Sequence, residues 1–149
     1  MGLGVNRPPV QACIFDMDGL LVDSEPFWQA AHTEVLGELG VDVGPFVASG
    51  LTTGMRVDEV IALWRAHKPW EGPSNEEVAR RIVTRVAASI RERAELLPGA
   101  AAALDYLAGF GLVLALATGS TSPVVDAVLD RFGLAGRFAA VCSAEQDTH

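Results

Sequence analysis

The run LVLALA at residues 112–117 limits the possible folds most, because it contains no polar side chain. It has the length of one strand, and a strand that is apolar on both faces needs cover on both faces, as in the centre of a parallel sheet. Two further runs, VQACIF at residues 10–15 and the weaker FAAVC at residues 138–142, are also predicted as strands. We therefore expect helices on each side of a buried sheet.

Helical patterns lie beside these runs. Residues 122–132 begin with Ser122 as a capping residue and Pro123 in the first turn, and they stop at Gly133. Residues 99–110 are predicted as the helix before the second strand. Strands that alternate with helices in this way predict a right-handed parallel α/β sheet of the Rossmann-like kind.

The segment that follows the first run breaks this alternation with helices alone. Helices are predicted over residues 24–40, with Ser24 as the cap, and near residues 56–67. A long third helix opens at Ser74, whose spacing to Glu77 is a capping-box pattern. Because each helix carries one apolar stripe, the three are expected to form a small bundle.

This interruption divides the chain in two. We assign residues 1–22 and 96–149 to an α/β core, and residues 23–95 to an α-helical cap domain inserted into it. Trp64 and Trp70 are expected to pack inside the cap rather than to form a substrate platform.

Composition excludes several classes of partner. The net charge of −8 and the lack of a Lys/Arg cluster argue against nucleic acid or an anionic membrane surface. The longest apolar run is too short to span a bilayer, and residues 1–9 lack the apolar centre of a secretion signal. We expect a soluble cytoplasmic protein in which Cys13 and Cys142 are buried, reduced thiols. The sequence indicates no oligomeric state.

The stretch IFDMDGLLVDSEP crowds acidic side chains against the first strand. Asp16 and Asp18 follow that strand directly, and side chains two residues apart in extended chain point the same way, with Cα atoms roughly 7 Å apart. Ligands of open α/β sheets bind at the carboxyl ends of the strands, and two carboxylates there suit Mg²⁺. Gly19 gives the backbone freedom to turn away. The alternative is a simple acidic turn, which Asp-Gly pairs often form.

A second polar group follows the central strand. The sequence Thr118-Gly119-Ser120 presents hydroxyls and free N–H groups just before a helix, which is a suitable cradle for an anion. An ordinary helix-capping turn is the alternative.

Together, IFDMDGL and LVLALAT resemble the first two motifs of the haloacid dehalogenase superfamily of phosphotransferases. The segments LLVDSEPFW, GMRVDEVIALW, PWEGPSNEEV and LLPGA are similar to those of bacterial phosphatases that act on 2-deoxyglucose 6-phosphate and hexitol phosphates. The β-phosphoglucomutases share the layout. The resemblance implies a Mg²⁺-dependent phosphatase with a capped Rossmann-like core, whose partner is a small phosphorylated substrate such as a hexose or hexitol phosphate.

The resemblance also implies roles for single residues. Asp16 would be the nucleophile that becomes an aspartyl phosphate, while Asp18 would protonate the leaving alcohol and then activate water. Mg²⁺ would be held by the Asp16 carboxylate and the Asp18 backbone carbonyl. The phosphate would be held by Thr118, Gly119 and Ser120.

Three cap residues, Glu25, Trp28 and Arg56, are candidates for contact with the sugar. Packing inside the cap is the alternative for Trp28, and surface charge is the alternative for Arg56. The histidines at positions 32, 67 and 149 have no partner at a recognisable spacing, so the sequence assigns them no role.

The chain departs from the family pattern in its later motifs. The family requires a Lys beside the nucleophile and further acids for Mg²⁺, but the one lysine, Lys68, lies in the predicted cap. Neither Glu145 nor Asp147 stands at a later strand end. We therefore expect an incomplete core, the N-terminal portion of a longer protein, with residues 10–15 as an exposed sheet edge.

An incomplete site predicts little or no turnover by residues 1–149 alone. Two alternatives to the phosphatase stay open. One is a β-phosphoglucomutase-like phosphotransferase, and the other is a non-catalytic fragment that at most binds metal or a partner strand.

Overall fold

The computed structural model describes residues 10–44 and 50–143 of the chain, so Glu145, Asp147 and His149 lie outside the described residues. In chain order the elements are β1 (Ala12–Phe15), α1 (Glu25–Glu38), α3 (Val57–His67), α4 (Asn75–Arg93), α5 (Ala100–Gly109), β2 (Val113–Thr118), α6 (Ser122–Phe132), the short 3-10 helix η1 (Ala135–Arg137) and β3 (Ala140–Ser143). All three expected strands and all five expected helices are present, with ends that differ by one or two residues.

The three described strands form one parallel sheet in the order β1-β2-β3. Phe15 pairs with Leu116, and Thr118 pairs with Ser143, so the carboxyl ends of the strands meet at one edge. The predicted α/β fold with a parallel sheet is confirmed. The run LVLALA becomes the central strand, β2, as its composition predicts.

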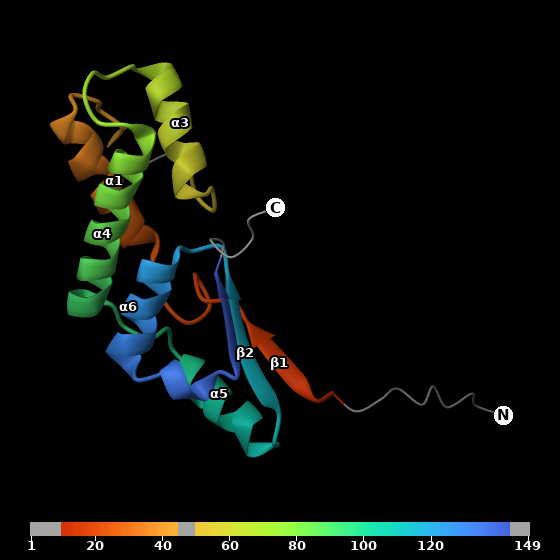
Figure 1. The fold of residues 1–149 in the computed structure, drawn as a ribbon. Coiled ribbons are helices and arrows are strands. Elements are labelled where there is room, and N and C mark those ends of the chain that lie inside the picture. The colour runs from red at the N-terminus through yellow and green to blue at the C-terminus, as the bar shows by residue number, and fades with distance from the viewer. Residues whose placement is uncertain (1–9, 45–49, 144–149) are drawn as a thin grey trace.

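Only one face of this sheet is covered by described helices. Helices α5 and α6 lie on the same side of it (Figure 1), because both crossover connections move along the sheet in the same direction and share the right-handed sense. On the uncovered face, Ile14 of the edge strand β1 is 71% exposed and Val113 of the central strand β2 is 51% exposed. The expectation of cover on both faces of residues 112–117 is therefore wrong for the described structure.

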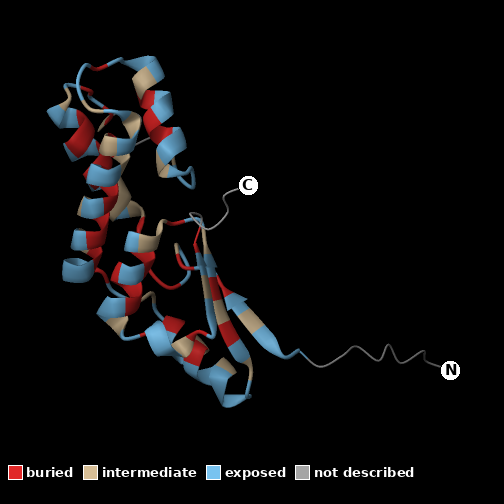
Figure 2. Cartoon of the chain, viewed as in Figure 1, coloured by how far each residue is buried: buried red, intermediate tan, exposed pale blue. Residues whose placement is uncertain are grey.

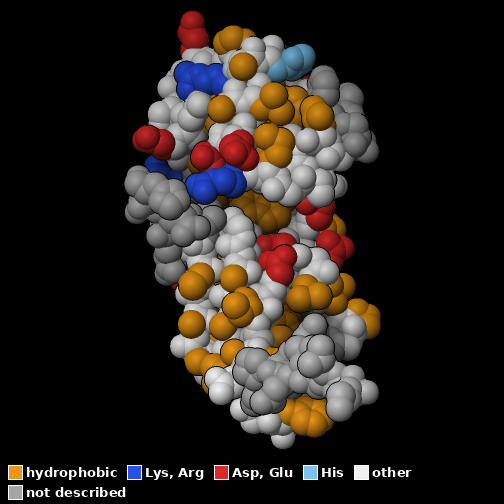
Figure 3. Space-filling view, turned by 90° about the vertical axis from the view of Figure 1, so that its right-hand side faces the viewer, with side chains coloured by type: hydrophobic (Ala, Val, Ile, Leu, Met, Phe, Trp, Pro, Cys, Tyr) orange, Lys and Arg blue, Asp and Glu red, His pale blue; other side chains and the backbone are white. Residues whose placement is uncertain are grey.

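The uncovered side is apolar along all three strands, and we call it the open face. Hydrophobic side chains gather in the lower half of this side of the molecule (Figure 3). Its members are Ala12, Ile14, Val113, Ala115, Ala117, Ala140 and Cys142. The expectation of two buried thiols is wrong: Cys142 lies on the open face and is exposed, and Cys13, on the covered side, is only half-buried against the core, although both are free.

Helices α1, α3 and α4 form a helical layer above the carboxyl ends of the strands (Figure 1). The segments coloured as buried alternate with exposed ones along each of these helices (Figure 2). Trp64 is 2% exposed and Trp70 is 7% exposed, which confirms that both pack inside this layer. Among the described residues, no helix is both long and apolar enough to cross a membrane.

Helix α4 joins the helical layer to the sheet, because it packs against α1 and α3 and also against α6. The Arg131 side chain of α6 donates hydrogen bonds to the carbonyls of Arg91 and Ala94, where α4 ends. A cation at this position satisfies carbonyls that lack a partner in the helix and is attracted by the helix dipole.

The chain enters and leaves the helical layer at one place. Val22 and Leu96 form an antiparallel bridge, and the Leu97 N–H donates to the Leu21 carbonyl at 2.8 Å. Before this point the Met17 carbonyl accepts hydrogen bonds from three successive N–H groups in a tight turn. Gly19 lies in that turn at φ 74°, which only glycine adopts without strain, as the sequence predicts.

Two capping expectations are corrected by the structure. Ser24 precedes α1 but makes no capping hydrogen bond, because its backbone is helical (φ −87°, ψ −17°) rather than extended as in a capping residue. Its hydroxyl donates to Asp18. Ser122 is the first residue of α6 rather than its cap, which is Thr121. The third expectation holds, since the Ser74 hydroxyl accepts a hydrogen bond from the Glu77 N–H at the start of α4.

Burial predicts how the helical layer responds to truncated side chains. Leu36 on α1 is fully buried, whereas Leu63 on α3 is 38% exposed. We expect Leu36→Ala to lower the free energy of unfolding by about 2–5 kcal/mol, through lost contacts and the cavity left behind. The matched control Leu63→Ala should lower it by less than about 1 kcal/mol. Urea unfolding measures both values, and equal losses would contradict the packing described.

Candidate active site

Two carboxylates from the end of β1 lie at the edge of the sheet that faces the helical layer. The Asp16 Oδ1 atom accepts a hydrogen bond from the Met17 N–H at 2.7 Å. This contact fixes the carboxylate, while its second oxygen has no hydrogen-bond partner among the described residues. Asp16 therefore keeps one oxygen available for a ligand.

The Asp18 carboxylate is held by three hydroxyls from two other segments. Its Oδ1 atom accepts from the Ser24 hydroxyl at 2.5 Å. Its Oδ2 atom accepts from the Thr118 and Ser120 hydroxyls, each at 2.8 Å. These donors orient the carboxylate and offset the repulsion expected between it and Asp16.

The loop after β2 has donors left over for another anion. The Ser120 N–H is used by the Thr118 hydroxyl at 3.1 Å. By contrast, the described hydrogen bonds use neither the Gly119 N–H nor the Thr121 N–H. The Thr121 hydroxyl is buried without a partner at the start of α6. Backbone N–H groups before a helix favour an anionic ligand.

A cavity of about 300 Å³ connects these strand ends to the helical layer. A hollow crosses the middle of the molecule in the view of Figure 3, with acidic side chains beside it. The cavity is lined by Asp16, Asp18, Ser24, Glu25, Trp28, Gln29, His32, Thr52, Gly54, Met55, Arg56, Val57, Gly119, Ser120 and Thr121. Its floor comes from the strand ends, and its walls come from α1 and the loop before α3.

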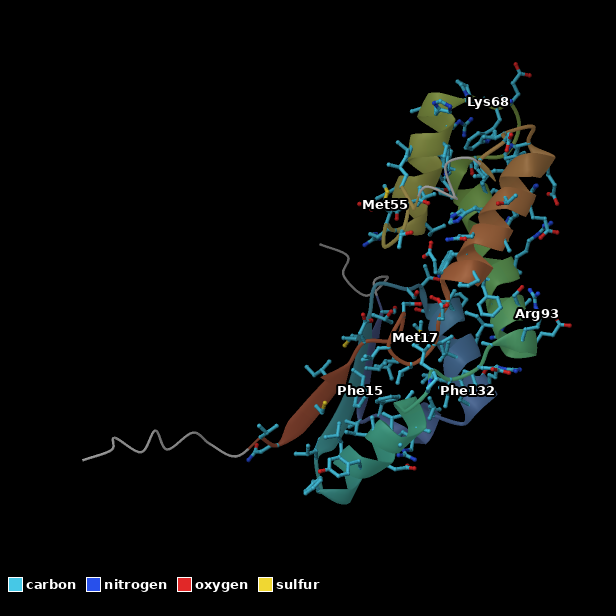
Figure 4. All side chains as sticks on the ribbon, turned by 180° about the vertical axis from the view of Figure 1, so that it is seen from behind. Phe15, Met17, Met55, Lys68, Arg93 and Phe132 are labelled. Atoms are coloured by element: carbon cyan, nitrogen blue, oxygen red, sulfur yellow. The ribbon has the colours of Figure 1, made fainter. Side chains whose placement is uncertain are left out.

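One face of α1 supplies four of the lining residues, at positions 25, 28, 29 and 32. Glu25 Oε1 accepts hydrogen bonds from Gln29 Nε2 at 3.1 Å and from the Thr53 hydroxyl at 3.0 Å. The second bond joins α1 to the loop before α3. Met55, labelled in Figure 4 where that loop meets α3, also lines the cavity.

Arg56 supplies a cation on the opposite wall. Its side chain is 51% exposed, and its Nε atom donates to Asp58 Oδ1 at 3.2 Å. Lys68 is not part of this site, because its Nζ atom donates to the Gly40 carbonyl at the far end of the helical layer (Figure 4).

His32 is the most deeply buried ionisable group on the wall of the cavity. Its ring stacks on Trp28, with centroids 6.0 Å apart and planes at 27°. Burial lowers the pKa of His32 from 6.5 to about 4, although the nearby Glu25 charge and a hydrogen bond to the Trp28 backbone act in the opposite direction. The imidazole is therefore neutral at pH 7.

Comparison with known proteins identifies the architecture. Residues 10–149 match the family model of haloacid dehalogenase-like hydrolases, which covers nearly the whole chain. The chain belongs to this family. The strand-end acids, the polar loop after β2 and the helical layer are thus features of a haloacid dehalogenase-like hydrolase.

Individual relatives agree with this family. The chain is 42% identical over 137 residues to hexitol phosphatase B of Escherichia coli (strain K12), covering 92% of this chain but 62% of that protein. The crystal structure of CbbY from Rhodobacter sphaeroides in complex with phosphate superposes with a TM-score of 0.82 at 26% identity, covering 95% of this chain and 66% of that one. A putative β-phosphoglucomutase from Thermotoga maritima gives a TM-score of 0.69 at 25% identity, covering 94% and 64%. The chain thus spans about two thirds or less of each.

The donors at the strand ends fit a hard divalent cation of the kind the family uses. Asp16 has one free carboxylate oxygen, and the Asp18 backbone carbonyl accepts no hydrogen bond among the described residues. The Asp18 carboxylate already accepts hydrogen bonds from three hydroxyls, so its backbone carbonyl is the more available donor for a metal. No group of three or more His, Cys, Asp or Glu side chains is placed to hold a metal within the described residues. Mg²⁺ suits such a sparse oxygen set, because it keeps several waters.

The structure gathers nearly every site residue that the sequence suggests. Seven of them line the same cavity: Asp16, Asp18, Glu25, Trp28, Arg56, Gly119 and Ser120. Thr118 lies just below it and contacts Asp18. His32 and Thr121 were missed. The spacing of His32 from Glu25 and Trp28 on one helix was the available signal for the first.

The pKa of His32 predicts how stability depends on pH. Below pH 6.5 the unfolded chain takes up a proton that the folded chain, with a pKa of about 4, does not bind. The free energy of unfolding should therefore fall by about 2 kcal/mol, through this residue, as the pH falls from 7 to 5. Urea unfolding at the two pH values should show a smaller loss for His32→Gln than for the wild type. Equal losses in the two proteins would refute the buried neutral state.

Proposed function

We propose that the chain carries the nucleophile and the acid/base of a Mg²⁺-dependent phosphatase for hexose or hexitol phosphates. The observation that carries this proposal is the shared cavity, in which Asp16 and Asp18 face a polar wall of α1 and the loop before α3. Its support is the family and the 42% identity to a protein named hexitol phosphatase B. The size of the cavity, about 300 Å³, suits a small phosphate ester.

The proposed chemistry has two displacements at phosphorus. A carboxylate oxygen of Asp16 attacks the phosphorus, the ester O–P bond breaks, and the leaving alcohol takes a proton from Asp18, which must enter this step in its protonated form. Water then gives a proton to Asp18 and attacks the aspartyl phosphate, which releases inorganic phosphate and restores Asp16. Mg²⁺, held by the Asp16 carboxylate and the Asp18 carbonyl, would neutralise the charge of the phosphoryl group.

The loop after β2 would receive the phosphate. Gly119 and Thr121 offer N–H groups that the described hydrogen bonds leave free, and Thr121 adds a buried hydroxyl. Thr118 and Ser120, which we also assign to phosphate binding, now donate to Asp18. They would share or redirect these bonds once a phosphate dianion is present.

We assign residues 23–95 to a cap domain, and residues 1–22 and 96–149 to the core. The support for this division is the point where Val22 pairs with Leu96 and Leu21 bonds Leu97. The proposed role of the cap is to contact the sugar through Glu25, Trp28 and Arg56, which all line the cavity.

The metal role of Asp16 can be tested by binding. In isothermal titration calorimetry, we expect sorbitol 6-phosphate to bind the chain at least about 10-fold more tightly with Mg²⁺ than without it. Asp16→Asn should abolish this Mg²⁺ dependence. The control Asp23→Asn, an exposed acid of the same stretch that does not line the cavity, should retain it. The same Mg²⁺ dependence in all three proteins would contradict the proposal.

Turnover by residues 1–149 alone is expected to be slight, because no lysine lines the cavity and Lys68 is engaged elsewhere. Release of inorganic phosphate from hexose and hexitol phosphates measures it. If the chain releases phosphate rapidly and Asp16→Asn abolishes that release, Asp16 is still the nucleophile, but the prediction of slight turnover is wrong. Binding without any release would favour the non-catalytic alternative.

A phosphotransferase is the second candidate, favoured by the likeness to a putative β-phosphoglucomutase. It differs from a phosphatase in the acceptor of the phosphoryl group, which is a sugar hydroxyl rather than water. Conversion of glucose 1-phosphate to an isomer without release of phosphate would select the mutase.

A further inference from the structure

The wall formed by α1 runs away from the reacting carboxylates, and His32 lies at its far end. The helix begins beside Ser24, whose hydroxyl contacts Asp18. Its lining residues then follow from Glu25 to His32 on one face. With a rise of 1.5 Å per residue, His32 lies roughly 10 Å further along the helix than Glu25. It therefore faces the part of a bound ligand that is remote from the phosphate.

The His32 ring has one nitrogen in use and one without a partner. The ring bonds the Trp28 backbone one turn earlier, an arrangement that suits an Nδ1–H donating to the carbonyl. In a neutral imidazole this leaves Nε2 as an acceptor with a lone pair. His32 lines the cavity and is 7% exposed as a residue, but its Nε2 atom is buried and has no hydrogen-bond partner, so a ligand hydroxyl would reach it by displacing the atoms that cover it. Buried polar atoms of this kind normally have partners.

The chemistry of this nitrogen selects among phosphate esters. A hydroxyl can donate a proton to the Nε2 lone pair, whereas a carboxylate has no proton to donate. The negative charge of Glu25, which acts on His32, opposes a second carboxylate nearby. The Trp28 ring beside it offers an apolar face to the carbon chain of a polyol.

We propose that His32 is a specificity-determining residue whose Nε2 atom accepts a hydrogen bond from a hydroxyl on the carbon chain of the substrate, remote from the phosphate. The inference rests on the proposed function, because it names what the same cavity recognises beyond the phosphate. It assigns polyhydroxylated phosphate esters to the cavity in preference to those that end in a carboxylate or an alkyl chain.

The experiment compares three ligands in calorimetry with Mg²⁺: sorbitol 6-phosphate, 1-hexyl phosphate and inorganic phosphate. The alkyl ester has six carbons and a phosphate but no hydroxyl. His32→Phe keeps an aromatic ring against Trp28 and removes the acceptor, whereas His32→Gln keeps an acceptor oxygen. His67→Phe is the matched control, since His67 is exposed on α3 and does not line the cavity.

We expect His32→Phe to weaken the binding of sorbitol 6-phosphate by about 10-fold, the value of one hydrogen bond to a buried acceptor. Binding of the other two ligands should stay as in the wild type. His32→Gln should recover part of the loss, and His67→Phe should bind all three ligands normally. In the wild type, the ¹⁵N resonance of His32 Nε2 should shift with sorbitol 6-phosphate but not with 1-hexyl phosphate.

Two results would overturn the inference alone. If His32→Phe binds sorbitol 6-phosphate as the wild type does, His32 serves packing only, and the proposed function stands. An equal loss for all three ligands would likewise show a packing defect. If the wild type binds neither sorbitol 6-phosphate nor inorganic phosphate, the proposed function itself fails and the inference fails with it.

Discussion

The Asp18 carboxylate joins the turn after β1 and the linker before α1 to the end of β2, which lies 100 residues later in the sequence, and the placement of the other elements depends on it. Ser24 reaches it from the linker before α1, and Thr118 and Ser120 reach it from the end of β2. The same charge thus sets the register between two strand ends and the point from which α1 rises. Hydrogen bonds to a charged group are about twice as strong as neutral ones, so one acid can fix this junction.

Local patterns were enough to find the elements, because helices and strands depend mainly on periodicity and end signals. The predicted apolar stripe of α3 is buried at Val60, Ile61 and Trp64 and half-buried at Val57, and Ser74 caps α4. Ser24 shows where local rules fail. It has the sequence of a helix cap, but its backbone is helical, and its hydroxyl donates to Asp18, which the turn at Gly19 brings near.

The site was also partly predictable from local patterns. Asp16 and Asp18 are marked by their place after a strand, and Glu25, Trp28 and Arg56 by a position beside the hinge or in a loop that could face the core. His32 was missed because its spacing from Glu25 and Trp28 shows that the three share one helix face but not that this face lines a cavity. The uncovered face of β2 was missed because composition shows that a strand is apolar but not which side the helices take. That choice follows from the handedness of the connections.

The bridge between Val22 and Leu96 has a consequence for how such a chain can change. The segment between Val22 and Leu96 starts and ends at neighbouring points, so it behaves as a closed loop. The entropic cost of closing a loop grows only with the logarithm of its length. Whole helices could therefore be added to or removed from this segment for a small entropic penalty. The pairing of β1 with β2 would be untouched, so the reacting groups could be inherited unchanged while the surface that reads the substrate is rebuilt.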